Sequence, residues 1–178
     1  KNRIWRDRKQ LWESTIRVAP SSAIACNNRG WESLSRGDEE EAADDFLRAI
    51  EIDGSSRTTA SALVNLAAIH EKRGESEEVL RLAARALKLF PGYPRALRME
   101  GGIYLRRKKY RRAARKFLEA IRRDRYDYRS HNQLGCLLSE IGSKEEAEEC
   151  FRNAINLNPD AAAPRKNLEK LKTAVTDR

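Results

Sequence analysis

Apolar and small residues recur along this chain in the pattern of paired amphipathic helices. Residues 128–161 hold two stretches of helical periodicity, which Gly142 separates and Pro159 ends. The apolar and small positions of these stretches are Leu134, Gly135, Leu138, Ala147, Phe151 and Ala154. The same pattern returns toward the N-terminus every 34 residues, with three extra residues at 57–59. A period of this length predicts a stack of helix-turn-helix repeats.

Columns of small and aromatic residues indicate where the two helices of a repeat meet. First helices carry a small residue at Gly30, Ala67, Gly101 and Gly135. The facing residues on the second helices are Ala42, Val79, Ala113 and Ala147. Three repeats then have a phenylalanine, at Phe46, Phe117 and Phe151, whereas the second repeat has Ala83. We therefore expect the small residues of the first helices to face those of the second. A third small column makes room for the next repeat, with the phenylalanines filling the space beside it, at Ala49, Ala86, Ala120 and Ala154.

The period divides the chain into four full repeats with a partial one at each end. The full repeats span residues 23–56, 60–93, 94–127 and 128–161. Residues 1–22 place Trp12 and Pro20 where a second helix has its aromatic and terminating residues, which predicts the orphan second helix of a truncated repeat. Residues 162–178 have Leu168 and Leu171 on one face, which predicts a capping helix and a frayed tail. The predicted fold class is all-α, a right-handed superhelical solenoid.

These recurring columns resemble the tetratricopeptide repeat family over residues 23–161. The chain departs from the family at Arg29 and Glu100, where leucine is usual, and at Gly54 and Arg125, where proline is usual. The departures leave the register of the repeats unchanged. The resemblance implies a non-catalytic scaffold that binds other protein chains.

A second resemblance is confined to residues 1–22. The spacing of Trp5, Trp12 and Pro20 is similar to the segment that joins membrane spans to repeats in multi-span membrane glycosyltransferase-like proteins with C-terminal tetratricopeptide repeats. This resemblance implies an appendage of a membrane-anchored enzyme, tethered upstream of Lys1. The chain also starts without a methionine, so we expect it to be part of a longer protein.

The motifs of the chain point away from chemistry. Cys26, Cys136 and Cys150 have no paired spacing, and His70 and His131 belong to different repeats. The sequence has no zinc-type ligand spacing, no nucleophile motif and no phosphate-binding loop. We therefore predict no catalytic residues, no metal and no cofactor.

The hydropathy of the chain bears on its location. No stretch approaches the roughly 20 consecutive apolar residues of a membrane-spanning helix, so we predict no transmembrane segment within this chain. Unpaired cysteines favour a reducing compartment, which makes the cytoplasm the expected location. A membrane tether upstream of Lys1 is the alternative.

In a stack of such repeats, the first helices line a concave groove. Amides occupy the fifth and sixth places of several repeats, at Asn27, Asn28, Asn65, Asn132 and Gln133. An amide both donates and accepts, so a row of amides can pair with the peptide groups of an extended chain. The resemblance carries this role to Asn28 and Asn65 directly and to Gln133 by analogy. The alternative is that these amides are polar surface or bond to nearby carbonyls.

Three arginines are expected in the same groove, at Arg95, Arg98 and Arg129. A guanidinium group matches a carboxylate in shape and charge, so the expected ligand is an acidic peptide. The family's carboxylate-binding pattern is incomplete, because Trp31 and Met99 stand where a second asparagine and a second cation are usual. Trp31 either anchors an apolar side chain of a partner or packs against the N-terminal helix.

Positive charge is concentrated in the third repeat. The formal net charge of the chain is +9, and the densest basic run is Arg106, Arg107, Lys108, Lys109, Arg111, Arg112, Arg115 and Lys116. This basic patch has three interpretations: a solvated face, a phosphate-binding surface for RNA or an anionic membrane, and a docking surface for an acidic protein. Acidic runs at 39–45 and 145–149 make another copy of the chain one such protein. Self-association through complementary charged repeats is therefore a further hypothesis.

Overall fold

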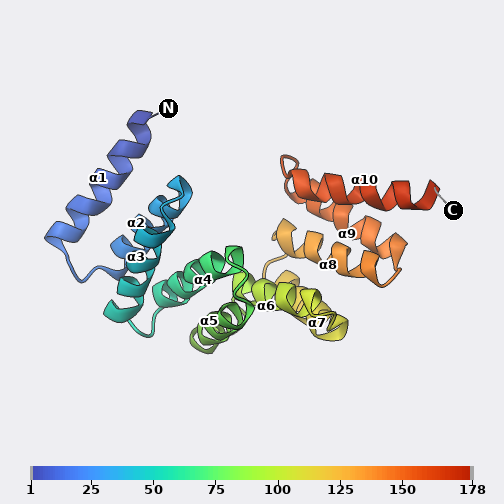
Figure 1. Ribbon diagram of the computed structural model, residues 1–178, viewed down its shortest axis with the longest axis horizontal. Helices are drawn as coiled ribbons and strands as arrows, with labels where there is room; N and C mark the ends of the chain where they lie inside the picture. The colour runs from blue at the N-terminus through green and yellow to red at the C-terminus, as the bar shows by residue number, and fades with distance from the viewer. Residues whose placement is uncertain (1, 177–178) are drawn as a thin grey trace. The chain divides into compact units, whose positions relative to one another are not determined.

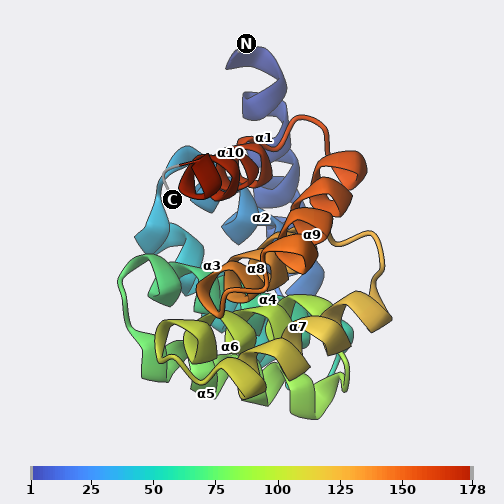
Figure 2. The ribbon, with the colours of Figure 1, turned by 90° about the vertical axis from the view of Figure 1, so that its right-hand side faces the viewer.

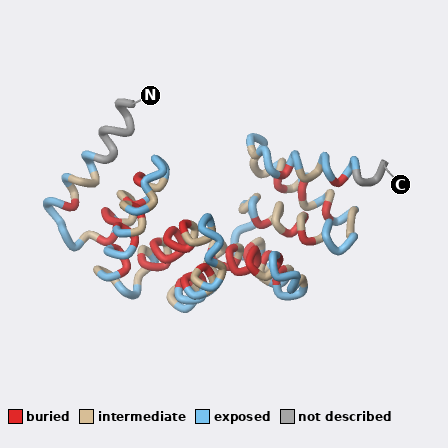
Figure 3. The backbone as a smooth tube through the Cα atoms, viewed as in Figure 1, coloured by how far each residue is buried: buried red, intermediate tan, exposed pale blue. Residues whose placement is uncertain are grey.

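The computed structural model describes the backbone of residues 2–176 and the side chains of residues 10–173. Every regular element in the described backbone is a helix, which confirms the all-α prediction (Figure 1). The chain divides into two compact units, Lys1–Pro91 and Gly92–Arg178. In both units the buried residues lie along the helices, while the turns between helices are exposed or half-buried (Figure 3).

The first unit stacks two complete helical hairpins behind one additional helix. Its elements are α1 (Asn2–Val18), α2 (Ala23–Arg36), α3 (Glu39–Ile52), α4 (Arg57–Lys72) and α5 (Ser76–Leu89). Each helix packs against the next along the chain, and α2 also contacts α4. On α1, Ile16 is buried and Trp12 is half-buried, whereas the side chain of Trp5 lies outside the described residues.

The second unit repeats this arrangement and ends on a single helix. Its elements are α6 (Pro94–Arg106), α7 (Tyr110–Arg123), α8 (Tyr128–Glu140), α9 (Lys144–Leu157) and α10 (Ala162–Thr176). Helix α10 lies against α9 and also contacts α8 (Figure 2). Leu171 of α10 is buried and Leu168 packs beside it, so the apolar face of this helix covers the last hairpin. Residues 177–178 lie outside the described part of the chain.

A glycine lets the two helices of a hairpin approach closely in three of the repeats. A Cβ atom added to Gly101 would lie 2.5 Å from Cε1 of Phe117, and one added to Gly135 would lie 2.7 Å from Cε1 of Phe151. The nearest neighbour of these glycines is thus the phenylalanine ring, not the expected alanine, because the ring reaches across the hairpin. The second repeat, which lacks the ring, has Ala67 where the others have glycine.

The departures at Arg29 and Glu100 are explained by ion pairs within the hairpins. Nε of Arg29 donates to Oδ2 of Asp45 at 2.7 Å, and Asp45 is buried. Nζ of Lys116 lies 2.5 Å from Oε2 of Glu100, which is also buried. Both pairs join residues 16 apart, at equivalent places of the first and third repeats, with the charges exchanged. A partly buried ion pair therefore replaces an apolar contact in these two repeats.

Candidate functional site

One face of α2 carries exposed apolar groups beside amides. Ile24 is 61 % exposed and Trp31 is 49 % exposed, and Asn27 and Asn28 lie between them at helical spacing. Asn28 is half-buried, and its side-chain amide has no hydrogen-bond partner among the described residues. We call Ile24, Asn27, Asn28 and Trp31 the α2 face. Half of the Trp31 surface is thus open, so packing within the chain covers only part of this ring.

Asn65 is bound within the protein. Its side chain is 3 % exposed, and Nδ2 donates to Oδ1 of Asn27 at 3.1 Å. The predicted role of Asn65 in peptide binding stays a prediction. The amide joins α4 to α2, and it also occupies the carbonyl oxygen of Asn27.

The same link recurs in the second unit. Nδ2 of Asn167 on α10 donates to Oδ1 of Asn132 at 3.0 Å and also lies 3.3 Å from the sulfur of Cys136. In both units, an asparagine at the fifth place of one repeat accepts from an asparagine at the sixth place of the next. Asn132 is therefore also used between helices. Gln133 is half-buried, and its side chain has no hydrogen-bond partner among residues 10–173.

Arg98 and Arg129 of the second unit both contact Asp127, and the charge of Arg95 acts on Arg98. Nε of Arg98 donates to Oδ2 of Asp127 at 3.2 Å, and the Arg98 side chain is 17 % exposed. Burial lowers the pKa of Arg98; the charge of Asp127 opposes this shift, while the positive charges of Arg129 and Arg95 add to it. The structure thus places Arg95, Arg98 and Arg129 close enough for their charges to interact. We call these three residues the arginine cluster.

Asp127 is already saturated by groups of its own chain. Its carboxylate accepts from the backbone N of Arg129 at 3.1 Å and from Oγ of Ser130 at 2.6 Å, in addition to Arg98. These bonds cap the N-terminus of α8, so Arg98 is held in a structural role. Ligand binding by Arg98 therefore stays a prediction, in which the side chain would have to serve Asp127 as well.

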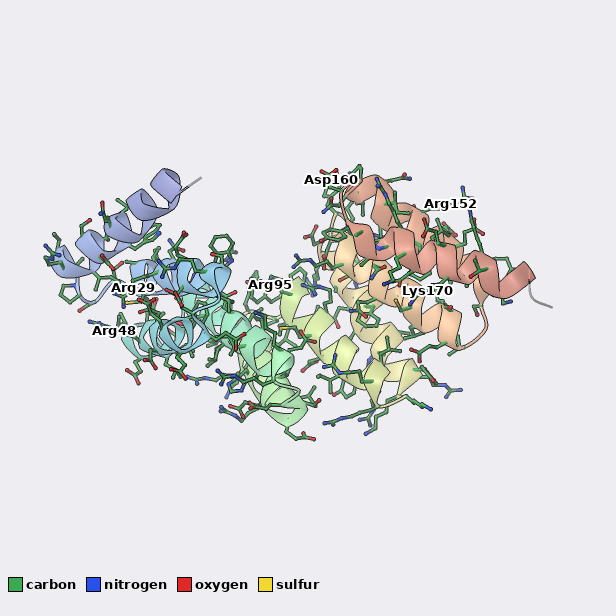
Figure 4. The ribbon with its side chains drawn as sticks, turned by 45° about the horizontal axis from the view of Figure 1, so that its top comes forward. Arg29, Arg48, Arg95, Arg152, Asp160 and Lys170 are labelled. Atoms are coloured by element: carbon green, nitrogen blue, oxygen red, sulfur yellow. The ribbon has the colours of Figure 1, made fainter. Side chains whose placement is uncertain are left out.

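The other two members of the cluster have different surroundings. Arg129 is exposed, with its guanidinium carbon 5.6 Å from the centre of the Tyr128 ring and Nε donating to the Tyr128 hydroxyl at 3.1 Å. Arg95 lies at the beginning of α6 and is half-buried (Figure 4). Neither has a carboxylate partner among the described residues. The cluster therefore keeps two guanidinium groups without an internal counter-charge.

The capping helix also brings cations toward α8, which sequence reasoning missed. The positive charge of Lys170, labelled on α10 in Figure 4, acts on the thiol of Cys136 on α8. Lys166 lies one turn earlier on α10 and is exposed. Continuing the 34-residue register past residue 161 places Lys166 at the fifth place and Asn167 at the sixth, and this signal could have found both.

The basic patch is smaller than the sequence suggests. Lys116 is half-buried and pairs with Glu100 of the same hairpin. The guanidinium carbon of Arg112 lies 6.0 Å from the centre of the Tyr104 ring. The exposed members of the patch are Arg106, Arg107, Lys108, Lys109, Arg111, Arg112 and Arg115. Lys108 has a backbone φ of 53°, in the turn where other repeats have glycine.

The histidines and cysteines are separated from one another. His70 contacts Glu75, while Nε2 of His131 lies 3.3 Å from the backbone oxygen of Arg125. Burial raises the pKa of Cys26, and burial together with the charges of Glu149 and Glu146 raises that of Cys150 to about 11. Within the described residues, no three His, Cys, Asp or Glu side chains gather as a metal site would need. The described helices also include none with the length and hydropathy of a membrane span.

The chain is similar to part of two human proteins. It is 31 % identical over 131 residues to the protein O-mannosyl-transferase TMTC2 of Homo sapiens. This alignment covers 67 % of this chain and 16 % of the relative. It is 30 % identical over 167 residues to TMTC3 of Homo sapiens, which covers 91 % of this chain and 18 % of the relative. The chain thus spans less than a fifth of the length of either relative.

Several solved structures share the fold. The Cut9 and Hcn1 complex of the APC/C matches with a TM-score of 0.86 at 18 % identity, over 96 % of this chain and 34 % of that chain. YrrB, described as a TPR protein with an unusual peptide-binding site, matches with a TM-score of 0.66 at 19 % identity, over 94 % of this chain and 84 % of that one. The first TPR of Spaghetti (RPAP3) bound to the HSP90 peptide SRMEEVD matches with a TM-score of 0.61 at 19 % identity. The match covers 68 % of this chain and 96 % of that chain.

Two family models, both described as tetratricopeptide repeat, match this chain. One matches residues 23–56 and 128–161, and the other matches residues 64–128. These ranges cover the α2–α3 and α8–α9 hairpins and most of the helices between them. The helical hairpins, the close glycine contacts and the neighbouring solenoid structures agree with this match. This chain belongs to the tetratricopeptide repeat family.

Proposed function

We propose that this chain is a non-catalytic scaffold whose arginine cluster binds an acidic segment of another protein. The observation that carries the proposal is that Arg95 and Arg129, whose charges act on Arg98, have no carboxylate partner among the described residues. Arg98 and Asp127 neutralise each other, which leaves Arg95 and Arg129 with two positive charges facing no internal acid. A partner's carboxylate would supply the missing negative charge and would accept hydrogen bonds from the guanidinium group of Arg95 or of Arg129.

The α2 face is a separate proposed contact region, within the first unit. Trp31 and Ile24 offer an exposed aromatic ring and an exposed aliphatic side chain, which suit an apolar anchor of the partner. Asn28 and Gln133, the sixth-place amides without internal partners, are the proposed contacts for the peptide backbone. Asn27, Asn65 and Asn132 serve the scaffold itself, since their amides bond to each other or to Asn167.

The solved structures support a peptide ligand in general terms. Two of the similar folds are described with a peptide-binding site or a bound peptide, and the bound peptide SRMEEVD ends in an acidic residue. The likeness to these proteins is in fold. The acidic preference of this chain therefore rests on its own arginine cluster.

The test is a binding measurement with a matched pair of peptides. One labelled peptide carries several glutamates and a free C-terminal carboxylate, and the other has glutamine in place of glutamate with an amidated end. Fluorescence anisotropy should detect binding of the acidic peptide, with affinity falling as salt is raised. The double variant Arg95→Glu, Arg129→Glu should weaken that binding at least about tenfold.

The control for charge alone is Arg152→Glu. Arg152 is an exposed arginine on α9, away from the cluster, and it pairs with Glu148 (Figure 4). Arg98 is left intact in every variant because its pair with Asp127 caps α8.

Equal affinity of the double variant and the wild type, with helicity unchanged, would refute the proposal. Loss of binding on Arg111→Glu, Arg115→Glu instead would move the working surface to the basic patch, and binding of RNA or anionic vesicles there would favour the phosphate-binding interpretation.

A second candidate function follows from the similarity to TMTC2 and TMTC3. We infer that the chain is the repeat region of a membrane-anchored mannosyltransferase-like protein, in which it would present a protein substrate to the enzyme. The supporting observation is identity of 30 % or more to both relatives over a small part of their length. Determining the complete coding sequence tests this inference. Membrane-spanning segments upstream of Lys1 are the expected result, and a coding sequence without them would contradict it.

A further inference from the structure

The first unit contains an apolar groove that the proposed peptide sites do not use. The cavity has a volume of about 360 Å³ and is lined by residues of α3, α4 and α5. Its apolar lining is formed by Leu47, Ile50, Leu66, Ile69 and Leu82. Leu47 is 46 % exposed, although the lining residues beneath it are buried. We call this cavity the α3–α5 groove. It is at the lower end of the size of ligand pockets, about 300 to 1,000 Å³, so it suits one or two apolar side chains.

The rim of the α3–α5 groove is positively charged. Arg73, Arg81 and Arg85 line it, with Glu78 as the acidic member. Nε of Arg81 donates to Glu78 at 2.9 Å, and Nε of Arg73 lies 3.6 Å from Glu39. Arg85 has no acidic partner among the described residues and is exposed. An occupant of the groove should therefore combine an apolar side chain with negative charge around it.

The fourth repeat presents a group with that chemistry. Ile141 follows α8 and is 48 % exposed. Glu140, Glu145 and Glu146 surround it in sequence, and all three are exposed, without a cationic partner among the described residues. We call Ile141 and these glutamates the Ile141 knob. Ile141 stands at the repeat position of Arg73, and Glu149 stands at that of Arg81, so equivalent surfaces of the two units have opposite character.

We propose that the Ile141 knob of one copy docks into the α3–α5 groove of a second copy of this chain. The apolar side chain would enter the lining beside Leu47, and the glutamates would meet Arg85 and Arg81 at the rim. Knob and groove are different surfaces, so the contact forms either once, joining copies head to tail, or twice across a two-fold axis. The association is independent of the proposed peptide binding, because it involves neither the arginine cluster nor the α2 face.

The expected association is weak and sensitive to salt. One apolar side chain and a few surface charges make a small contact, which places it among transient interfaces. Raising salt shortens the range of the charge attraction, from about 30 Å at 0.01 M to about 10 Å at 0.1 M. Sedimentation equilibrium at high protein concentration should therefore give a mass above that of one chain at low salt, which falls toward the monomer as salt increases.

Two variants and two matched controls test which surfaces are used. Arg85→Glu disables the groove, and Ile141→Ser disables the knob; each should weaken association at least about tenfold. The control for the arginine is Arg122→Glu, a charge reversal at an exposed position of α7. The control for the isoleucine is Leu118→Ser, since Leu118 is 55 % exposed on the same helix. Circular dichroism verifies that all four proteins keep their helicity.

A mixing experiment provides the decisive result. The groove variant keeps an intact knob and the knob variant keeps an intact groove, so the two proteins should each be monomeric alone and form a one-to-one dimer when mixed. Each mixed pair can form one knob–groove contact, whereas an interface that joins either surface to its own copy would not be restored in this way. The proposal is overturned by a wild-type chain that stays monomeric at high concentration and low salt, by association that only the control variants weaken, or by a mixture that remains monomeric.

Discussion

Replacing Lys116 with methionine should leave a buried carboxylate without its counter-charge. Glu100 is 7 % exposed on α6, and Nζ of Lys116 lies 2.5 Å from its Oε2. The contact meets the distance of an ion pair but not the geometry of a hydrogen bond, and Oε2 has no hydrogen-bond partner among the described residues. The ammonium group is therefore its main compensation. Removing one member of a buried ion pair costs about 3 to 5 kcal/mol.

The position of the pair narrows this estimate. The Lys116 side chain is 20 % exposed and that of Glu100 is 9 % exposed, so water can reach the pair from one side. We therefore expect Lys116→Met to lower the free energy of unfolding of this hairpin by about 3 kcal/mol, at the lower end of the range. Methionine keeps most of the aliphatic stem, so the change reports chiefly on charge.

The chain itself supplies the matched replacement for both members. The equivalent residues are Leu66 and Leu82 in the second repeat and Leu134 and Cys150 in the fourth. Changing Glu100 and Lys116 together to leucine should therefore leave stability within about 1 kcal/mol of the wild type, because well-packed apolar residues often replace a buried ion pair without loss. The single and double changes should thus differ by about 2 kcal/mol or more.

Urea unfolding followed by circular dichroism measures these differences in the free energy of unfolding. Amide hydrogen exchange of α6 and α7 gives the local value, since repeats interact mainly with their neighbours. The reasoning fails if Lys116→Met costs less than about 1 kcal/mol, or if the double leucine variant is as unstable as the single one. Either result would mean that Glu100 does not depend on Lys116.

Other features of the structure give three further predictions. Gly101→Ala should destabilise the third repeat by about 1 to 3 kcal/mol, because the new Cβ would lie 2.5 Å from the Phe117 ring. Gly54→Ala is the control, since an added Cβ there would meet nothing within 4 Å and should not destabilise the protein. Thermal unfolding compares the two variants. Asn65→Ala should cost about 1 to 3 kcal/mol of stability through its unpaired amide partner, while peptide affinity per folded molecule stays the same in anisotropy titrations. Cys150, with a pKa of about 11, should have about one thiol in a thousand ionised at pH 8. Its alkylation should therefore be slow at pH 8 and accelerate as the pH rises toward 11. An alkylation rate that levels off near pH 9 would contradict the raised pKa.

The periodic positions of the sequence were sufficient to predict the fold. Gly101 and Phe117 repeat at a constant interval because each repeat makes the same internal contacts, so the pattern itself carries the geometry. The all-α repeat architecture and the family followed from such columns and are confirmed. Even so, the pattern did not tell which residue is nearest to the glycine, since the ring and the alanine are equally periodic.

The polar positions required the tertiary structure. Arg29 and Glu100 look like isolated departures in the sequence, yet each has a partner of opposite charge on the other helix of its hairpin. Asn65 has the residue type and the place of a peptide ligand, but its amide is buried against Asn27. The groups left over for a ligand are those that the chain has not already satisfied.

The sequence by itself thus determined the architecture of this protein, and the tertiary structure decided which side chains remain available for binding. The physical reason lies in how the two kinds of residue are stabilised. An apolar side chain needs only burial, which a periodic pattern specifies. A polar side chain needs a particular partner within hydrogen-bonding distance, and that partner is found only when the helices are packed together.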